Sequence, residues 1–186
     1  MQKNWCARLG MYVLVILPLV SPAALSQGGG NNGDRSTWPR IKSPADDFSI
    51  RFPGNPQYNV GPMDNGGSIL RFSYNNERID GILYQIESIG FPTAPETWPP
   101  AQRAASDAQW ENMPAQSGGV ILDRRVAEIS GYQARERTWK AQNLFARSKY
   151  LFKGRNLYNL SVIAADRTAL TSPQAEYFFA CFKLRD

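Results

Sequence analysis

The fold is decided by the stretch FARSKYLFKGRNLYNLSVI, residues 145–163, which contains two strand patterns joined by one tight turn. In its second half Tyr158, Leu160 and Val162 alternate with other residues, as in a strand with one buried face. The turn at 153–156 contains glycine and asparagine, which tight turns favour. The stretch therefore predicts an antiparallel hairpin.

Strand patterns continue upstream of this hairpin. A short half-buried strand is expected at 48–52, a hairpin at 70–74 and 79–89, and another hairpin at 120–129 and 132–139. Consecutive strands that are joined by short turns pair antiparallel. We therefore expect one antiparallel sheet of about six strands.

Two helices are expected beside these strands, so the fold class is α+β with helices packed on the sheet. The first has Thr97 as its expected N-cap and ends near Met113-Pro114. Its small residues at helical spacing form a face that is able to lie against a sheet: Ala101, Ala104, Ala105 and Ala108. The second helix begins after Ser172 and carries an apolar stripe that must be covered: Ala175, Phe178, Phe179 and Phe182.

The opening FSIRFPGNP at 48–56 and the closing stretch at 150–182 resemble the PsbP-like family. That fold is shared with DcrB-type bacterial envelope proteins and with a Ran-binding nuclear import factor, and the likeness covers roughly residues 46–185. The resemblance implies an α/β/α sandwich. It implies no common catalytic motif, since members serve as photosystem subunits, binding factors and chaperone-like adaptors.

The first 26 residues have the features of a secretory signal peptide. Lys3 and Arg8 precede an apolar run at 9–20 that is shorter than a membrane-spanning helix. Cleavage is expected after Ser26, with cleavage after Ala24 as second choice and an uncleaved anchor helix as the alternative. We therefore expect an exported protein, periplasmic or secreted, with no transmembrane span in its mature form.

The mature chain is expected to contain one domain. Residues 27–47 are rich in Gly, Asn, Ser and Pro and predict a flexible leader, and residues 48–186 predict a single PsbP-like domain. The mature chain would keep one cysteine, Cys181. Because Cys181 lies beside phenylalanines on the second helix, we expect a buried thiol in the core.

Composition restricts the chemistry of the chain. It has 186 residues, 21 of them Lys or Arg and 16 Asp or Glu, and it has no histidine. This excludes Ser-His-Asp and Cys-His catalysis and His-ligated zinc. No catalytic, cofactor-binding or metal-binding residue is predicted, so we expect a protein that is not an enzyme and needs no cofactor.

The distribution of charge is the most informative feature. Residues 43–122 contain four basic and nine acidic residues, whereas residues 123–155 contain nine basic and three acidic ones. On neighbouring strands such charges can form one basic patch, and the predicted partner-binding residues are Arg135, Arg137, Arg147, Lys149, Lys153 and Arg155. Such a patch would attract an acidic envelope protein, an anionic lipid or a polyanionic glycan, while nucleic acid is not expected. The alternative is that these charges pair with the acidic half or are solvated.

Three functions follow in order of preference. The first is a non-enzymatic binding or adaptor module of the cell envelope. The second is a carrier of a hydrophobic ligand or segment, with a groove between the terminal helix and the alanine face of the first helix. The third is a hydrolase that uses only carboxylates, which would need Asp107, Glu111 and a third acid in one cleft.

Overall fold

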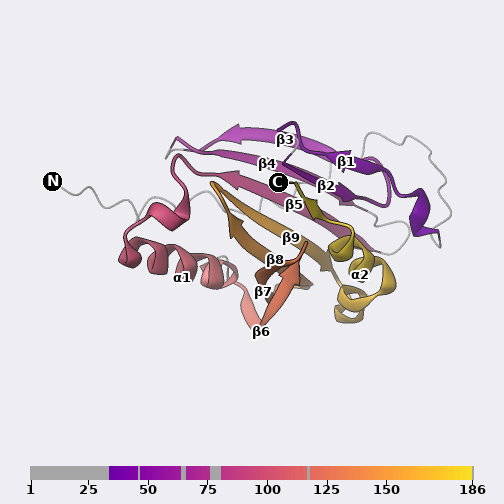
Figure 1. The fold of residues 1–186 in the computed structure, drawn as a ribbon. Coiled ribbons are helices and arrows are strands. Elements are labelled where there is room, and N and C mark those ends of the chain that lie inside the picture. The colour runs from indigo at the N-terminus through magenta and orange to yellow at the C-terminus, as the bar shows by residue number, and fades with distance from the viewer. Residues whose placement is uncertain (1–33, 46, 64–65, 76–80, 117, 186) are drawn as a thin grey trace.

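Two antiparallel sheets and two α-helices make up the described part of the chain (Figure 1). The computed structural model describes residues 34–45, 47–63, 66–75, 81–116 and 118–185. The expected signal peptide and the leader up to residue 33 lie outside these ranges.

The larger sheet has seven strands, one more than expected, in the order β3-β4-β5-β9-β8-β7-β6. Its strands are β3 (Gln57–Pro62), β4 (Ser68–Asn75), β5 (Ile82–Gly90), β6 (Val120–Ile129), β7 (Tyr132–Ala141), β8 (Leu144–Lys153) and β9 (Asn156–Ala164). All neighbours pair antiparallel, and the hairpin expected at 145–163 is confirmed as β8–β9, closed by the pair Lys153 and Asn156. The expected start of β5 at residue 79 lies outside the described residues.

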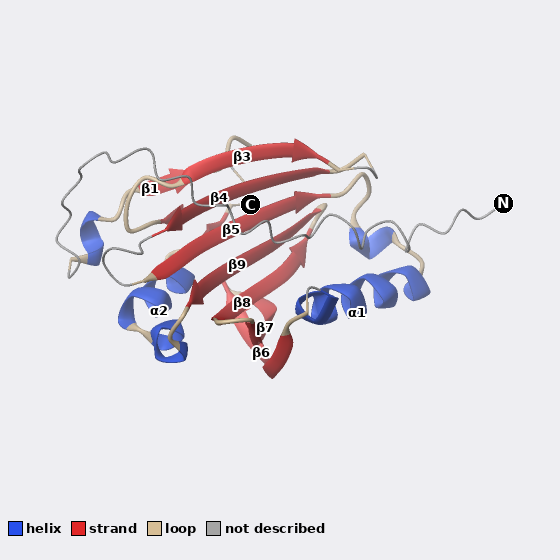
Figure 2. Ribbon diagram, turned by 180° about the vertical axis from the view of Figure 1, so that it is seen from behind, coloured by secondary structure: helices blue, strands red, loops and turns tan. Residues whose placement is uncertain are grey.

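The smaller sheet has the order β1-β2-β10. Its strands are β1 (Arg40–Lys42), β2 (Phe48–Arg51) and β10 (Lys183–Leu184). The helices are α1 (Pro100–Gln116) and α2 (Pro173–Ala180), with short 3₁₀ turns at Arg35–Thr37, Pro95–Thr97 and Arg167–Thr171. Figure 2 shows the larger sheet from behind, with α1 and α2 near opposite ends of its strands. The fold class is therefore α+β, as expected.

The main core lies between the large sheet and α2 together with the small sheet. Tyr84 and Phe178 lie edge-on with ring centroids 5.3 Å apart, and the ring centroid of Phe52 lies 5.4 Å from that of Phe178. The expected apolar stripe of α2 is buried here. Ser172 caps α2 as expected, since its hydroxyl accepts a hydrogen bond of 3.2 Å from the amide of Ala175.

The opposite face of the large sheet is covered in part by α1. Its buried residues are Trp110, Met113 and Pro114, and the first two of these pack with Ile89 and Leu157 in a second core cluster. The alanine face that was expected to meet the sheet is exposed instead, because the larger side chains on another face bury more apolar surface. The expected N-cap, Thr97, ends the preceding 3₁₀ turn, and the helix begins at Pro100. No helix within the described residues is long and apolar enough to cross a membrane.

The folded part of the chain begins before Phe48. Trp38 is 5% exposed and its ring lies edge-on to Tyr84 at 5.7 Å and to Tyr177 at 5.3 Å. Ile41 of β1 pairs with Ile50 of β2. Residues 34–45 therefore pack with the domain rather than acting as the flexible leader that the Gly- and Pro-rich composition suggested.

We expect Trp38→Ala to lower the free energy of unfolding by about 3–5 kcal/mol, because it empties an aromatic site in the main core. Urea denaturation followed by fluorescence measures this, with Lys42→Ala on the exposed side of β1 as the matched control. Equal stability of the two variants would show that the segment before Phe48 contributes nothing to the core.

Candidate binding cleft

The register between β7 and β8 divides the predicted basic patch between the two faces of the sheet. Arg135 lies opposite Tyr150 and Arg137 opposite Ser148, whereas Lys149 lies opposite Glu136. Opposed residues share a face and successive residues alternate, so Arg135 and Arg137 point to the α1 side. Arg147 and Lys149 point to the α2 side. The single patch expected from the sequence is therefore not formed.

On the α2 side, Arg147 is part of a buried ion-pair network. It is 4% exposed, and its Nε and Nη2 donate to the two carboxylate oxygens of Glu136 at 2.8 and 3.2 Å. Its Nη1 donates to the carbonyl of Leu170 at 3.2 Å and pairs with Glu176 on α2. Lys149 Nζ lies 3.6 Å from Glu136. These charges join the sheet to α2 and leave little positive charge free for a partner.

The ionisation of Glu136 depends on this network. Burial acts to raise the pKa of Glu136, but hydrogen bonds and charge from Arg147 and Arg125 outweigh burial and hold the pKa below its ordinary value. Burial likewise acts to lower the pKa of Arg147, and the same pairing reverses that direction. Both groups are therefore charged at neutral pH.

The last two predicted residues lie away from both pairs. The ammonium of Lys153 lies 4.0 Å from the ring centroid of Tyr132 and hydrogen-bonds its hydroxyl. Arg155 Nε donates to the carbonyl of Phe91 at 2.9 Å. Lys153 and Arg155 therefore hold neighbouring loops and strands and do not extend a common patch.

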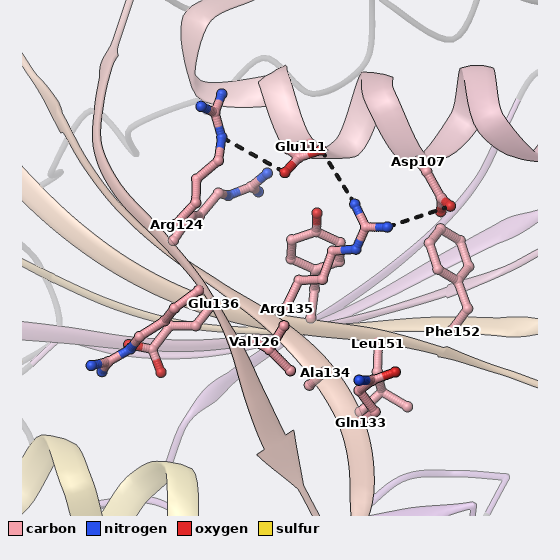
Figure 3. A pocket seen from close by; sticks show the side chains of 13 residues that line it. Asp107, Glu111, Arg124, Val126, Gln133, Ala134, Arg135, Glu136, Leu151 and Phe152 are labelled. Carbon is pink, nitrogen blue, oxygen red and sulfur yellow. Dashed lines mark hydrogen bonds and ion pairs between the residues drawn. The ribbon is translucent and has the colours of Figure 1, made fainter.

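On the α1 side, a cleft of about 560 Å³ lies between α1 and strands β6–β8 (Figure 3). We call it the arginine cleft and define it by Asp107, Glu111, Arg124, Arg135, Arg137 and Tyr150. It combines three arginines from two strands with two carboxylates from one face of α1. Side chains of unlike charge therefore surround this open volume.

Weak ion pairs cross the mouth of the arginine cleft. Arg135 Nη1 lies 3.2 Å from Glu111 and its Nη2 lies 3.8 Å from Asp107, while Arg124 Nε lies 3.8 Å from Glu111 (Figure 3). The Arg135 side chain is 49% exposed. Exposed pairs of this kind contribute about 0–1 kcal/mol each, so an incoming anion can replace the carboxylates at little cost.

The floor of the cleft contains a buried arginine without a carboxylate. Arg137 is 2% exposed; its Nη1 donates to the carbonyl of Trp110, and its guanidinium lies 5.0 Å from the ring centroid of Tyr150. Its Nε and Nη2 have no hydrogen-bond partner among the described residues, and neither has the Tyr150 hydroxyl. Three buried polar atoms at one site thus lack the hydrogen bonds that buried groups normally make.

The unused side of Arg137 is the side with which other arginines of this sheet hold carboxylates. Arg71 uses Nε and Nη2 to bind one oxygen of Glu87, at 2.9 and 2.6 Å. Arg125 binds Glu136 with the same two nitrogens. In Arg137 this pair of donors remains available for an acidic group.

Arg137 remains a cation despite its burial. Desolvation lowers its pKa to about 10, partly opposed by Tyr150 and Glu87. Desolvation also raises the pKa of Tyr150, so that its hydroxyl stays protonated at neutral pH and is able to donate. The floor of the cleft therefore presents a positive charge and several donors.

The two other functional hypotheses find less geometric support. The phenylalanines of α2 are in the main core and the alanine face of α1 is exposed, so these two surfaces do not border one groove. Asp107 and Glu111 both pair with Arg135. The third acid that lines the cleft, Glu136, is engaged by Arg147.

Cys181 lies in the core as expected. It is buried, its Sγ accepts a hydrogen bond of 3.2 Å from the amide of Arg51, and burial raises the pKa of its thiol. A thiol in this state is a poor nucleophile.

Of the cleft residues, the charge pattern identified Arg135 and Arg137, and the spacing of four residues identified Asp107 and Glu111 as neighbours on one helix face. The sequence analysis did not identify Tyr150 or Arg124 as cleft residues. Tyr150 matches the aromatic pattern of any core strand, and no strand alternation distinguished Arg124 from its neighbours. Contact across the sheet, rather than any local signal, brings these residues together.

The fold is similar to that of solved proteins. Cyanobacterial PsbP from Synechocystis matches with a TM-score of 0.52 and 11% identity, covering 89% of this chain and 100% of that one. A protein from Bacteroides thetaiotaomicron matches at 0.46 and 12% identity over 79% of this chain, which spans 48% of that protein's length. A Pseudomonas aeruginosa protein of unknown function matches at 0.34 and 13% identity, covering 72% of this chain and 85% of that one.

The chain therefore has a PsbP-like α+β fold. The similarity to cyanobacterial PsbP is one of fold alone, since the identity is 11%. No protein-family model matches the sequence, and no curated protein matches it.

The Glu136 network makes stability depend on pH. We expect Glu136→Gln to cost about 3 kcal/mol at neutral pH, since it removes the buried carboxylate that Arg125, Arg147 and Lys149 share. The folded-state pKa of Glu136 is lowered, so its contribution is present above the unfolded pKa of about 4.3 and is lost as the pH falls through the folded value. The difference between wild type and variant should therefore shrink in acid.

Chemical denaturation at a series of pH values measures this difference. Glu96→Gln is the matched control, because Glu96 is exposed in the 3₁₀ turn at Pro95–Thr97 and its change should stay within about 0.5 kcal/mol. A stability gap between wild type and Glu136→Gln that is the same at acid and neutral pH would contradict the pairing.

Proposed function

We propose that the protein is an exported, non-enzymatic binding module of the cell envelope, and that it holds a carboxylate of an acidic partner segment in the arginine cleft. The observation that carries this proposal is the buried, protonated Arg137, whose Nε and Nη2 lack a hydrogen-bond partner among the described residues. A buried charge is costly to leave unpaired, and a carboxylate is the side-chain group that fits two parallel guanidinium donors.

The mouth of the cleft favours an acidic segment over a single small ion. Arg135 lines the same cleft as Arg137 and its side chain is 49% exposed, so it can bind a further carboxylate of the same segment. To reach Arg137, an acidic side chain replaces Asp107 and Glu111 as the partner of Arg135. The pairs of Arg135 that are lost are exposed and weak, while the bond to Arg137 is new and buried.

Localisation and the absence of catalysis rest on the sequence. The signal-like segment at 1–26 supports export, and the lack of histidine removes the commonest catalytic base. Members of the PsbP-like family that act as binding factors are consistent with this role, although the fold by itself assigns none.

Isothermal titration calorimetry with a peptide rich in Asp and Glu tests the proposal, with citrate as a small carboxylate probe. We expect Arg137→Lys to weaken peptide binding roughly tenfold, because lysine keeps the charge but loses the paired donors. Tyr150→Phe removes only the hydroxyl and should weaken binding several-fold. Arg137→Lys and Tyr150→Phe change buried residues and could disturb folding. Arg135→Gln changes an exposed residue of the same cleft, so it tests peptide binding without that risk.

The matched control is Arg103→Gln, which removes a positive charge from α1 outside the arginine cleft and should leave the affinity unchanged. No measurable binding of either probe by the wild-type protein would contradict the proposal. So would an equal loss of affinity in Arg103→Gln and Arg137→Lys, because it would indicate attraction by net charge alone.

A further inference from the structure

Strand β6 is the last strand on one side of the large sheet, and no other strand of the described residues lies beside it there (Figure 1). It has ten residues, most of them exposed, including Val126 at 70% and Val120 at 64%. An edge strand of this length presents unpaired main-chain N–H and C=O groups, and exposed valines on such a strand favour pairing with another chain.

The turn that follows β6 determines which of its main-chain groups point outward. Ser130 and Gly131 form a two-residue turn with φ of 54° and 82°, the values of a type I′ hairpin. In this hairpin the flanking residues, Ile129 and Tyr132, exchange both hydrogen bonds. Because bonding alternates along the strand, the N–H and C=O groups of Arg124, Val126 and Glu128 point away from β7.

We propose that β6 pairs antiparallel with β6 of a second copy of this chain, with the two-fold axis at Val126. In this register Val126 lies opposite Val126 of the second copy, and Arg124 lies opposite Glu128 of the second copy at both ends. The outward main-chain groups of all three residues then bond to one another. The two valines meet on the axis. An ion pair between Arg124 of one copy and Glu128 of the other lies on each side of them.

Charge selects this register from its neighbours. A two-fold axis perpendicular to the sheet keeps the α1 side of both copies on one face. Such an axis can also pass through Arg124 or through Arg125. Either choice places an arginine opposite the same arginine of the second copy. An axis at Ala127 also avoids like charges, but it places Val126 opposite Glu128 and forms no ion pair between the strands. Pairing about Val126 avoids like charges and forms two ion pairs. Toward the start of β6, a bulge between Ile121 and Asp123 interrupts its regular pairing with β7. We therefore expect the two copies to pair only over residues 123–129.

The opposite edge of the sheet lacks such a pattern. Strand β3 is also exposed, but its six residues, QYNVGP, contain no charge and end in proline. A contact between β6 and β3 of another copy would be head-to-tail and would leave free edges at both ends of the pair. Self-pairing of β6 closes at two copies.

The current contacts of Arg124 do not oppose this pairing. Its Nη2 donates to Asn112 at 2.9 Å and its Nε lies 3.8 Å from Glu111, and all these groups are partly or fully exposed. Such contacts exchange readily for a carboxylate of the second copy.

Analytical ultracentrifugation of the wild-type chain over a range of concentrations tests the proposal, and we expect a monomer–dimer equilibrium. Arg124→Glu places like charges opposite each other twice, so we expect it to raise the dimer dissociation constant roughly tenfold. Arg124→Glu combined with Glu128→Arg restores opposite charges and should restore dimerisation.

A second variant separates pairing from folding. Val126→Pro removes an N–H that points away from β7, so it should abolish the dimer while the circular dichroism and melting temperature change little. A wild-type chain that stays monomeric at every concentration would overturn the proposal. A dimer that persists in Val126→Pro, or a double charge reversal that fails to restore the dimer, would also overturn it.

Discussion

The alternation of side chains across the seven-stranded sheet is the constraint on which the rest of the structure depends. Each residue of β7 and β8 belongs to the face covered by α1 or to the face covered by α2, and the register Arg137–Ser148 decides which. Shifted by one residue, β8 would turn Arg147 and Lys149 toward Arg137 and leave Glu136 without its partners. With the observed register, four basic residues of these two strands separate into a structural network, Arg147 and Lys149, and a binding cleft, Arg135 and Arg137.

The two buried arginines show what this separation produces. Arg147 has a carboxylate on the next strand and another on α2, and its pairing joins the sheet to the main core. Arg137 is buried to a similar extent, but its partners are the main-chain carbonyl of Trp110 and the aromatic ring of Tyr150. A protein that needed Arg137 only for stability would be better served by an apolar residue or by a carboxylate beside it. Its unfilled donors are therefore the feature that points most directly to a ligand.

Local signals predicted the local parts of this fold. The β8–β9 hairpin follows from alternation and a Gly-Asn turn, and the start of α2 follows from Ser172 and Pro173. Contacts distant in sequence were not predictable in the same way. In the sequence Trp38 lies within a linker-like segment, and only the fold brings its ring against Tyr84 and Tyr177. Helix α1 buries Trp110 rather than its alanines. The candidate site was predicted in part, because the charge pattern identified Arg135 and Arg137. Only the strand pairing shows that Arg147 points to the opposite face of the sheet and that Tyr150 lies beside Arg135.

The central claim is that Arg137 binds an acidic group from outside the chain. Nuclear magnetic resonance of the arginine side chains tests this most directly, because it observes the Nε–H of each guanidinium while the Asp/Glu-rich peptide is added. The account predicts that the Arg137 Nε–H resonance moves downfield as it gains a carboxylate, while the already paired Arg147 stays in place. An Arg137 resonance that does not move, while those of exposed arginines do, would contradict it.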